Sequence, residues 1–332
     1  MASVRIGVLG AASIASAAIV KPALTVDDVE ILSLAARDRG RAQALAAKRG
    51  IPKVHGSYDE LLADPNINAV YIPLPNSLHG AWTLAALEAG KHVLCEKPFT
   101  ANAEEAERVA KAANASGLVV MEAFHWRYHP LAMRMVEIVR SGELGTLRRV
   151  DASFAFPLLK RVDIRWQLDL AGGALMDAGC YAIHMVRTLA GTEPEVVGAR
   201  AKLRSPGVDR AMAVDLEFPD GVRGRAVASM WSSSVLRLMA RAEGDAGSMQ
   251  VFNPLAPHTY HRLVVKTAAG TRRERIAGGS TYMHQLQAFV AAVRDGAPTL
   301  TPPEESVANM RVIDAAYRAA GMEPRVGATD LV

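Results

Sequence analysis

The sequence has little cysteine and no long hydrophobic run. Only two cysteines, Cys95 and Cys180, occur in 332 residues, which excludes a disulfide-stapled scaffold and a cysteine metal cluster. We expect both to be small core residues. No apolar run reaches the ~18 residues that a membrane helix needs. The N-terminus lacks the charged region, apolar stretch and cleavage site of a secretory leader. We therefore expect a soluble, cytoplasmic protein without a membrane partner.

A basic stripe is also absent. The net charge is only +4, and the pairs Arg148-Arg149 and Arg272-Arg273 lie in apparent strands, where such pairs usually face solvent. We expect no nucleic-acid partner. The length of 332 residues suits two domains, and a hydrophobic content of 50% allows a large core.

Strand and helix patterns alternate over the first third of the chain. Strands are predicted at Val4–Gly10, Val29–Arg37, Ala69–Leu74, His92–Lys97 and Leu118–Phe124. Helices are predicted at Ile14–Leu24, Arg39–Arg49, Ser77–Glu88 and Ala103–Ala115. This α/β alternation predicts a parallel sheet with helices on both faces.

The rest of the chain is richer in strands, so we place a domain boundary near Phe124, giving domains 1–123 and 124–332. Strands are predicted at Arg210–Phe218, Val222–Met230, Leu236–Glu243, Ser248–Phe252 and His261–Thr267. Helices are predicted at Leu131–Arg140, Gly173–Leu189, Met283–Arg294 and Pro303–Ala319. The second domain is therefore expected to be α+β with an open, mainly antiparallel sheet.

The first strand ends in a small-residue loop, Gly10 to Ala15, at the place of a dinucleotide-binding fingerprint. Gly10 allows a tight turn, and small residues let the backbone of Ala12, Ser13 and Ile14 approach a pyrophosphate at the helix N-terminus. Alanines replace two of the usual glycines, so an ordinary strand-turn-helix remains an alternative.

The second strand ends at Arg37, about 20 residues beyond the loop, where a ribose-binding acid is usual. An arginine holds a 2′-phosphate instead, and Arg41 lies one helical turn on. This favours NADP(H), with NAD(H) still possible because Asp38 is adjacent. The alternative is that Arg37 is an ordinary surface arginine.

Several motifs together resemble the glucose–fructose oxidoreductase / inositol dehydrogenase (Gfo/Idh/MocA) family from end to end. They are Cys95-Glu96-Lys97-Pro98, Pro73 to His79, Ala86 to Val93, Gly172 to Tyr181 and Val307 to Arg311. The resemblance implies a Rossmann domain followed by an α/β domain on an open antiparallel sheet.

The resemblance also implies residue roles. Lys97 matches the catalytic lysine, and its peptide bond to Pro98 is typically cis in the family. A cation there would stabilise negative charge that develops on the alcohol oxygen. The implied cofactor contacts also include Pro73, Asn76, His79, Glu96 and Lys97. The alternative for Lys97 is a surface lysine paired with Glu96.

Asp177, Tyr181 and His184 stand on one face of the predicted helix Gly173–Leu189. Tyr181 matches the branch with NADP-dependent xylose dehydrogenase and dimeric dihydrodiol dehydrogenase, where tyrosine is the general acid/base and the lysine lowers its pKa. Asp177 would orient the substrate or Lys97, or else bond to backbone. His184 would contact nicotinamide or substrate, although a core histidine is favoured.

Substrate contacts are expected from Trp126, Arg127, Arg165, Tyr181, His184 and Tyr282, with core packing as the alternative for each aromatic. His125 and His129 are four residues apart, but no third possible ligand lies at a spacing typical of a metal site, so no metal is expected.

The sequence thus predicts an NADP(H)-dependent oxidoreductase that acts on a CH–OH or C=O group of a sugar-like substrate, a cyclitol or a vicinal diol. A non-catalytic NADP-sensing regulator is the alternative, although a sensor has no need for Lys97, Asp177 and Tyr181 together. The open sheet should pair with its mate, so a homodimer is expected and a tetramer is an option.

Overall fold

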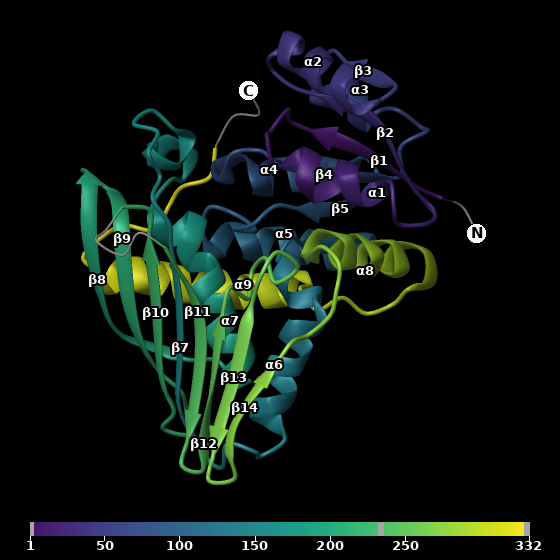
Figure 1. Ribbon diagram of the computed structural model, residues 1–332. Coiled ribbons are helices and arrows are strands. Elements are labelled where there is room, and N and C mark those ends of the chain that lie inside the picture. Colours follow the sequence, from purple (N-terminus) through teal and green to yellow (C-terminus); the bar gives the residue numbers. More distant parts are fainter. Residues whose placement is uncertain (1–2, 232–235, 329–332) are drawn as a thin grey trace. The chain divides into compact units, whose positions relative to one another are not determined.

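The computed structural model describes residues 3–231 and 236–328 (Figure 1). The chain forms two compact units, each discontinuous in sequence. The first contains the chain up to His125, Tyr282–Val307 and the segment from Gly327 onward, and the second contains Trp126–Thr281 and Ala308–Val326. The division of the chain into domains 1–123 and 124–332 remains a prediction.

The first unit is built on a six-stranded sheet in the order β3-β2-β1-β4-β5-β6, with every neighbouring pair parallel. The strand order reverses between β1 and β4, and ligands of such sheets bind outside the carboxyl ends at this point. The strands are β1 (Val4–Leu9), β2 (Val29–Ala35), β3 (Lys53–His55), β4 (Ala69–Ile72), β5 (His92–Cys95) and β6 (Val120–Glu122).

The helices of the first unit occur where the sequence predicted helices, except for Tyr58–Leu62, which the sequence did not predict. They are α1 (Lys21–Ala23), α2 (Arg39–Arg49), α3 (Tyr58–Leu62), α4 (His79–Glu88), α5 (Ala103–Ser116) and, from Tyr282 on, α8 (Thr281–Asp295). The helix expected at Ile14–Leu24 begins with a π-helical turn, Ser16–Val20, before α1. The sequence did not predict β3, because its three residues are too short for a periodic pattern.

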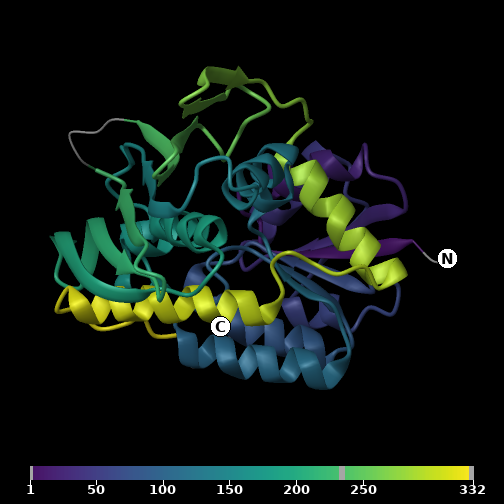
Figure 2. The same cartoon turned by 90° about the horizontal axis from the view of Figure 1, so that it is seen from below.

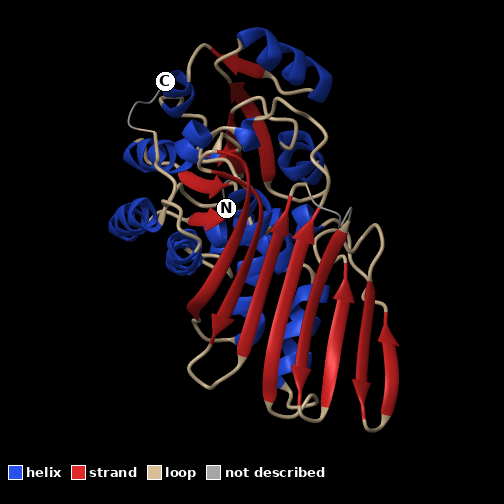
Figure 3. Ribbon diagram, turned by 90° about the vertical axis from the view of Figure 1, so that its left-hand side faces the viewer, coloured by secondary structure: helices blue, strands red, loops and turns tan. Residues whose placement is uncertain are grey.

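The second unit is built on an eight-stranded sheet in the order β14-β13-β12-β11-β7-β10-β9-β8 (Figure 3). Only the β7–β10 pair is parallel, so the predicted mainly antiparallel sheet and the α/β fold class are confirmed. The strands are β7 (Leu147–Ala155), β8 (Glu195–Ser205), β9 (Val208–Glu217), β10 (Arg223–Ser229), β11 (Arg237–Gly244), β12 (Gly247–Phe252), β13 (Arg262–Thr267) and β14 (Gly270–Glu274).

The helices α6 (Pro130–Arg140), α7 (Cys180–Ala190) and, from Ala308, α9 (Pro303–Ala319) belong to this second unit. Helix α7 packs on β7 and β10, where Val150, Ala152 and Ala226 are buried (Figure 2). Arg148 and Arg149 are exposed, as their pairing in the sequence predicted. The edge strand β8 was missed, because it is largely exposed and has no buried face.

Both cysteines are buried free thiols, as predicted. Within residues 3–231 and 236–328, no helix has the length and the apolar character needed to cross a membrane.

Candidate active site

The loop after β1 is shaped to receive a phosphate. Gly10 has a φ of +117°, and a Cβ there would lie 3.0 Å from the Leu74 side chain. Within the described residues, the backbone N–H groups of Ala12, Ser13 and Ile14 donate to no protein acceptor. Such N–H groups at the start of a helix form an anion site. The loop therefore fits the pyrophosphate of a dinucleotide.

Two arginines lie beside this loop, where the sequence predicted a side chain that recognises the ribose 2′ position. Arg37 follows β2 and is exposed, and Arg41 Nη2 donates to Ala11 O at 3.3 Å. The Asp38 carboxylate caps α2, since its Oδ1 accepts from Arg41 N–H at 2.9 Å. This carboxylate therefore faces the helix N-terminus, and the two guanidinium groups remain suited to a 2′-phosphate.

The Glu96-Lys97-Pro98 segment follows β5 at the same carboxyl edge. The Lys97–Pro98 peptide is cis, as the family resemblance predicted. The Tyr71 hydroxyl donates to Glu96 Oε1 at 2.6 Å, and Lys97 N–H donates to Glu96 Oε2 at 3.3 Å. The buried Glu96 carboxylate thus holds the backbone of Lys97, whose side chain is half-buried.

His79 contacts this segment through the backbone carbonyl group of Pro98. Its fully buried ring lies with Nδ1 2.7 Å from Pro98 O and Nε2 2.8 Å from Leu74 O. Burial and, to a smaller extent, the Lys97 charge lower the pKa of His79 to about 4, although the two carbonyl groups oppose this shift. His79 is therefore neutral at pH 7. Its contact with a cofactor, and those of Pro73 and Asn76 beside it in the sequence, remain predictions.

Tyr282 lies close to the lysine segment within the first unit. Its ring is 4.2 Å from that of His125, with 37° between the planes. Burial raises the pKa of Tyr282, the Glu96 charge raises it further and the Lys97 charge lowers it. The structure thus groups Glu96, Lys97, His125 and Tyr282, of which the sequence had not singled out His125 as a site residue.

The second unit carries Asp177 and Tyr181. Asp177 lies in a π-helical turn, Leu175–Gly179, that leads into α7. Arg165 Nη1 is 3.6 Å from Asp177 Oδ2, while the same guanidinium binds both oxygens of Asp163 at 2.8 and 3.1 Å. The Tyr181 ring meets Phe154 edge-on at 5.5 Å. Arg165 therefore positions Asp177, and π-helical turns are frequent at functional sites.

Trp126 and His184 meet in the core of the second unit. The Trp126 indole donates to His184 Nδ1 at 3.1 Å, and both side chains are almost completely buried. Burial holds the pKa of His184 well below its usual range, and the charges of Arg187 and Arg127 act in the same direction. His184 is therefore a neutral acceptor. Substrate contact by Trp126, Arg127 or His184 remains a prediction.

A buried ionic network fixes the start of the segment that carries Asp177. Asp209 Oδ1 accepts from Arg325 Nη2 at 2.9 Å and from the Tyr317 hydroxyl at 3.1 Å. Its Oδ2 accepts from Leu175 N–H at 2.7 Å, and Arg325 Nε donates to Gly172 O at 2.8 Å. Burial raises the pKa of Asp209, against the effect of Arg325.

The histidine pair considered for a metal has other roles. His129 Nδ1 caps α6 by accepting from Leu131 N–H at 3.0 Å, and His125 stacks on Tyr282. No group of three His, Cys, Asp or Glu side chains suited to a metal occurs in the described part of the chain.

Two family models match the chain. Residues 4–124 match the oxidoreductase family with an NAD-binding Rossmann fold, and residues 132–250 match the GFO/IDH/MocA C-terminal domain. A D-xylose 1-dehydrogenase (NADP(+)) of Haloferax volcanii is 39% identical over 316 residues, which cover 95% of this chain and 96% of that protein. The chain belongs to the GFO/IDH/MocA oxidoreductase family. The predicted family and the oxidoreductase class are confirmed.

Two further proteins also match over nearly the whole chain. The trans-1,2-dihydrobenzene-1,2-diol dehydrogenase of Mus musculus is 31% identical, and the match covers 96% of this chain and 98% of that protein. A solved 3-ketoreductase of Actinomadura kijaniata, in complex with NADP and TDP-benzene, superposes with a TM-score of 0.89 at 29% identity, covering 96% of this chain and 98% of that one.

The sequence missed the residues that support the site. Asp209 is more than 100 residues from Tyr317 and Arg325 in the chain, and Tyr71 lies in an apolar strand. Of these residues, only Tyr71 could have been suspected from the sequence, because a tyrosine in a buried parallel strand needs a partner for its hydroxyl.

Gly173 offers a test of the Asp209 network. It has a φ of +133°, and a Cβ there would collide with Asp209 Oδ1 and lie 2.8 Å from Arg325 Nη2. Gly173→Ala should lower the free energy of unfolding by about 3 kcal/mol, through strain and disruption of a buried ion pair. Urea denaturation measures this.

The matched control is Gly198→Ala in β8, where a Cβ meets nothing within 4 Å. It should change the unfolding free energy by less than about 0.5 kcal/mol. Equal effects of the two substitutions would show that the network does not constrain Gly173.

Proposed function

We propose that this protein is an NADP(H)-dependent dehydrogenase or reductase that moves a hydride between the nicotinamide and a CH–OH or C=O group of a sugar, cyclitol or vicinal diol. The observation that carries the proposal lies within the first unit. The loop with three available N–H groups follows β1, and Lys97 follows β5, at one carboxyl edge of a parallel sheet. Ligands of such sheets bind at this edge.

The bound nucleotide would supply the hydride acceptor or donor. The residues that we assign to proton movement are Lys97 and Tyr181. The lysine ammonium stabilises negative charge on the reacting oxygen, and the tyrosine hydroxyl gives or takes the proton. Asp177, held by Arg165, orients the reacting group. Arg127, Tyr282, Trp126 and His184 remain candidate substrate contacts.

The relatives support the cofactor and the substrate class. The Haloferax relative is named as an NADP-dependent xylose dehydrogenase, the mouse relative as a diol dehydrogenase, and the ketoreductase is bound to NADP. These names share a reaction at a CH–OH or C=O group, and the Haloferax name specifies a sugar. A cytoplasmic location remains a prediction.

We also propose a homodimer through the helix-free face of the sheet in the second unit. Five half-buried side chains form one row across five strands of this face, because the pairing register joins them side by side. In order, they are Ala213, Val227, Ser153, Met239 and Phe252. Several arginines on the same face are paired locally, as in the Arg225–Asp215 pair at 2.9 Å. An open sheet face with a largely apolar row suits contact with a second copy.

Loss of the lysine tests the catalytic assignment. Lys97→Met should lower turnover at least 100-fold, because the group that stabilises the reacting oxygen is gone. Tyr181→Phe should also lower turnover and should change the pH profile. Turnover is read from NADPH absorbance with a panel of aldoses, cyclitols, diols and dicarbonyls, and NADPH binding from its fluorescence.

NADPH should still bind to both variants. The control Lys111→Met removes an exposed lysine of α5 and should leave turnover unchanged. Near-normal turnover of Lys97→Met would refute the assignment, and no turnover of the wild type with any substrate would favour a sensor.

The two arginines test the cofactor assignment. The double variant Arg37→Gln/Arg41→Gln should raise the KM for NADP about 10-fold or more and should change that for NAD little, since only NADP carries the 2′-phosphate. Lys48→Gln at the other end of α2 is the control for charge. An equal change in both KM values would contradict the assignment.

The sheet face tests the dimer. Ser153→Lys places a charge in the centre of the apolar row and should convert the dimer to a monomer in light scattering after size exclusion. Ala115→Lys, on the exposed side of α5, should leave the mass unchanged. A monomeric wild type, or a dimeric Ser153→Lys, would exclude this interface.

A further inference from the structure

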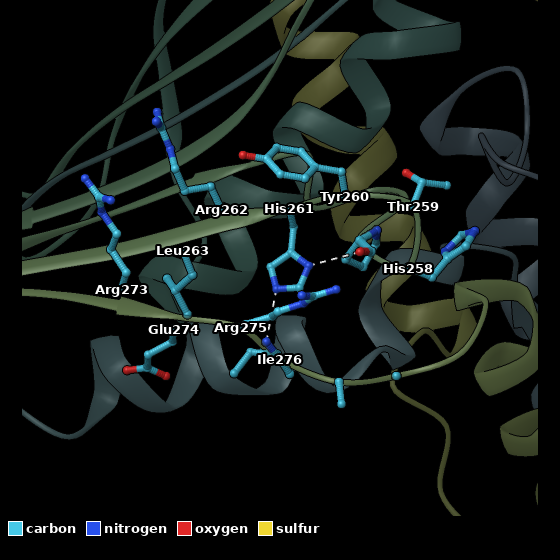
Figure 4. Close-up of a pocket in the computed structure, with 13 residues that line it drawn as sticks. His258, Thr259, Tyr260, His261, Arg262, Leu263, Arg273, Glu274, Arg275 and Ile276 are labelled. Carbon is cyan, nitrogen blue, oxygen red and sulfur yellow. Dashed lines mark hydrogen bonds between the residues drawn. The ribbon is translucent and has the colours of Figure 1, made fainter.

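The pocket at the open end of the β13–β14 hairpin, in the second unit, has a volume of about 590 Å³ (Figure 4). The His261 ring ties its walls together, because its Nε2 accepts from Ile276 N–H at 3.0 Å. Figure 4 shows Arg262 and Arg273 on one side and Arg275 extending away from them. These guanidinium groups therefore do not converge on one ligand. Convergent contacts occur instead where the chain after α9 meets a proposed cofactor loop.

The chain after α9 reaches the first unit at residues 327–328. Ala328 N–H donates to Ser77 O at 2.8 Å. Ser77 is fully buried in the short 3-10 turn Asn76–Leu78, between β4 and α4. Asn76, in the same turn, is one of the expected cofactor contacts. Residues 327–328 are therefore bonded to the backbone of a turn that is expected to meet the nucleotide.

The Glu105 side chain links the same residues to the chain that follows Lys97. Glu105 lies in the first turn of α5 and is almost completely buried, and its Oε2 accepts from Ala101 N–H at 2.8 Å. A Cβ on Gly327 would lie 2.5 Å from Glu105 Oε1. A Cβ on Gly80, in the first turn of α4, would collide with the same carboxylate. One carboxylate thus contacts α4, the chain after Lys97 and Gly327.

The surroundings of Glu105 suit a carboxylate and require a glycine beside it. Helix α4 begins at His79, so its positive N-terminal end lies against this carboxylate. Burial raises the pKa of Glu105, although the Ala101 N–H and the Arg108 charge oppose this shift. The φ of Gly327 lies outside the left-handed region. The close approach of Glu105, and not backbone strain, therefore excludes a side chain at Gly327.

The chain is fixed two residues before Gly327. Arg325, in the second unit, is buried, and it donates to Asp209 Oδ1 at 2.9 Å and to Gly172 O at 2.8 Å. A segment beyond the last helix is poorly ordered unless it is tied down. This nearby anchor lowers the entropy that is lost when Ala328 N–H bonds to the turn.

We propose that residues 327–328 form a strap that positions the turn Asn76–Leu78 for NADP(H), which makes Gly327 and Ala328 positioning residues for the cofactor. Without the strap, Ser77 O loses this hydrogen bond and the turn gains freedom. The cofactor must then bind a smaller population of the competent conformation, which weakens its apparent affinity. The effect on the cofactor rests on the proposed function, whereas the hold on the turn does not.

Hydrogen exchange of the cofactor-free protein tests the hold on the turn. Ala328→Pro removes the N–H donor and should speed exchange in peptides that cover residues 76–80 by about 5-fold or more. Ala328→Ser keeps the donor and should exchange like the wild type. Gly327→Val should act like Ala328→Pro, because its side chain collides with Glu105. The matched control is Gly198→Val, where a Cβ meets nothing within 4 Å, and it should leave these peptides unchanged.

Fluorescence titration with NADPH tests the consequence for the cofactor. Ala328→Pro and Gly327→Val should each raise the Kd for NADPH about 10-fold or more, while kcat at saturating NADPH and the urea midpoint stay close to those of the wild type. A merely structural role would move the midpoint and leave the Kd unchanged. In a Glu105→Ala background, Gly327→Val should raise the Kd little further, because the group with which it collides is gone.

The proposal is overturned if Ala328→Pro exchanges like the wild type, or if Ala328→Ser exchanges as fast as Ala328→Pro. It is also overturned if both strap variants bind NADPH as tightly as the wild type, or if Gly198→Val loses as much affinity as they do. Failure of the wild type to bind NADPH would overturn the proposed function, and the exchange data would still decide whether the strap holds the turn.

Discussion

Asp209 and Arg325 form an ion pair from which water is almost completely excluded. Burial of two charges is costly unless each of their polar atoms finds a partner. Here the partners include the two backbone groups, Gly172 O and Leu175 N–H, that precede Asp177. The chain therefore cannot shift at this point without leaving a charge unpaired, at a cost of roughly 3–5 kcal/mol. This constraint therefore fixes the start of the segment that carries Asp177 and Tyr181.

Buried polar groups also fix the backbone in the first unit. The buried Glu96 carboxylate accepts a hydrogen bond from the Tyr71 hydroxyl, and the His79 ring lies between two backbone carbonyl groups. Both lie against the backbone of the Lys97–Pro98 segment. The residues assigned to chemistry thus stand on short segments whose backbone is held by buried polar groups. Such fixed backbone keeps a reacting group in place at no entropic cost during the reaction.

The sequence predicted what depends on local patterns. The alternation of strand and helix predicted the parallel sheet, the loop at Gly10 predicted a phosphate site, and the triplet around Lys97 indicated the family. Contacts between distant segments left no such pattern. Asp209 and Arg325 are 116 residues apart, and Asp209 occupies an ordinary strand position. His125 and Tyr282 were likewise unconnected in sequence, so their stacking required the folded chain to be seen.

One face of the sheet in the second unit carries both an apolar row and a group of arginines, and two-fold symmetry distinguishes them. In a two-fold contact the same patch meets itself, so the patch must be self-complementary. The row from Ala213 to Phe252 meets this condition, because four of its five side chains are apolar and none is charged. Arg262 and Arg273 do not, because they would place cation against cation. The centre of a symmetric contact therefore belongs on the row and not on the arginines.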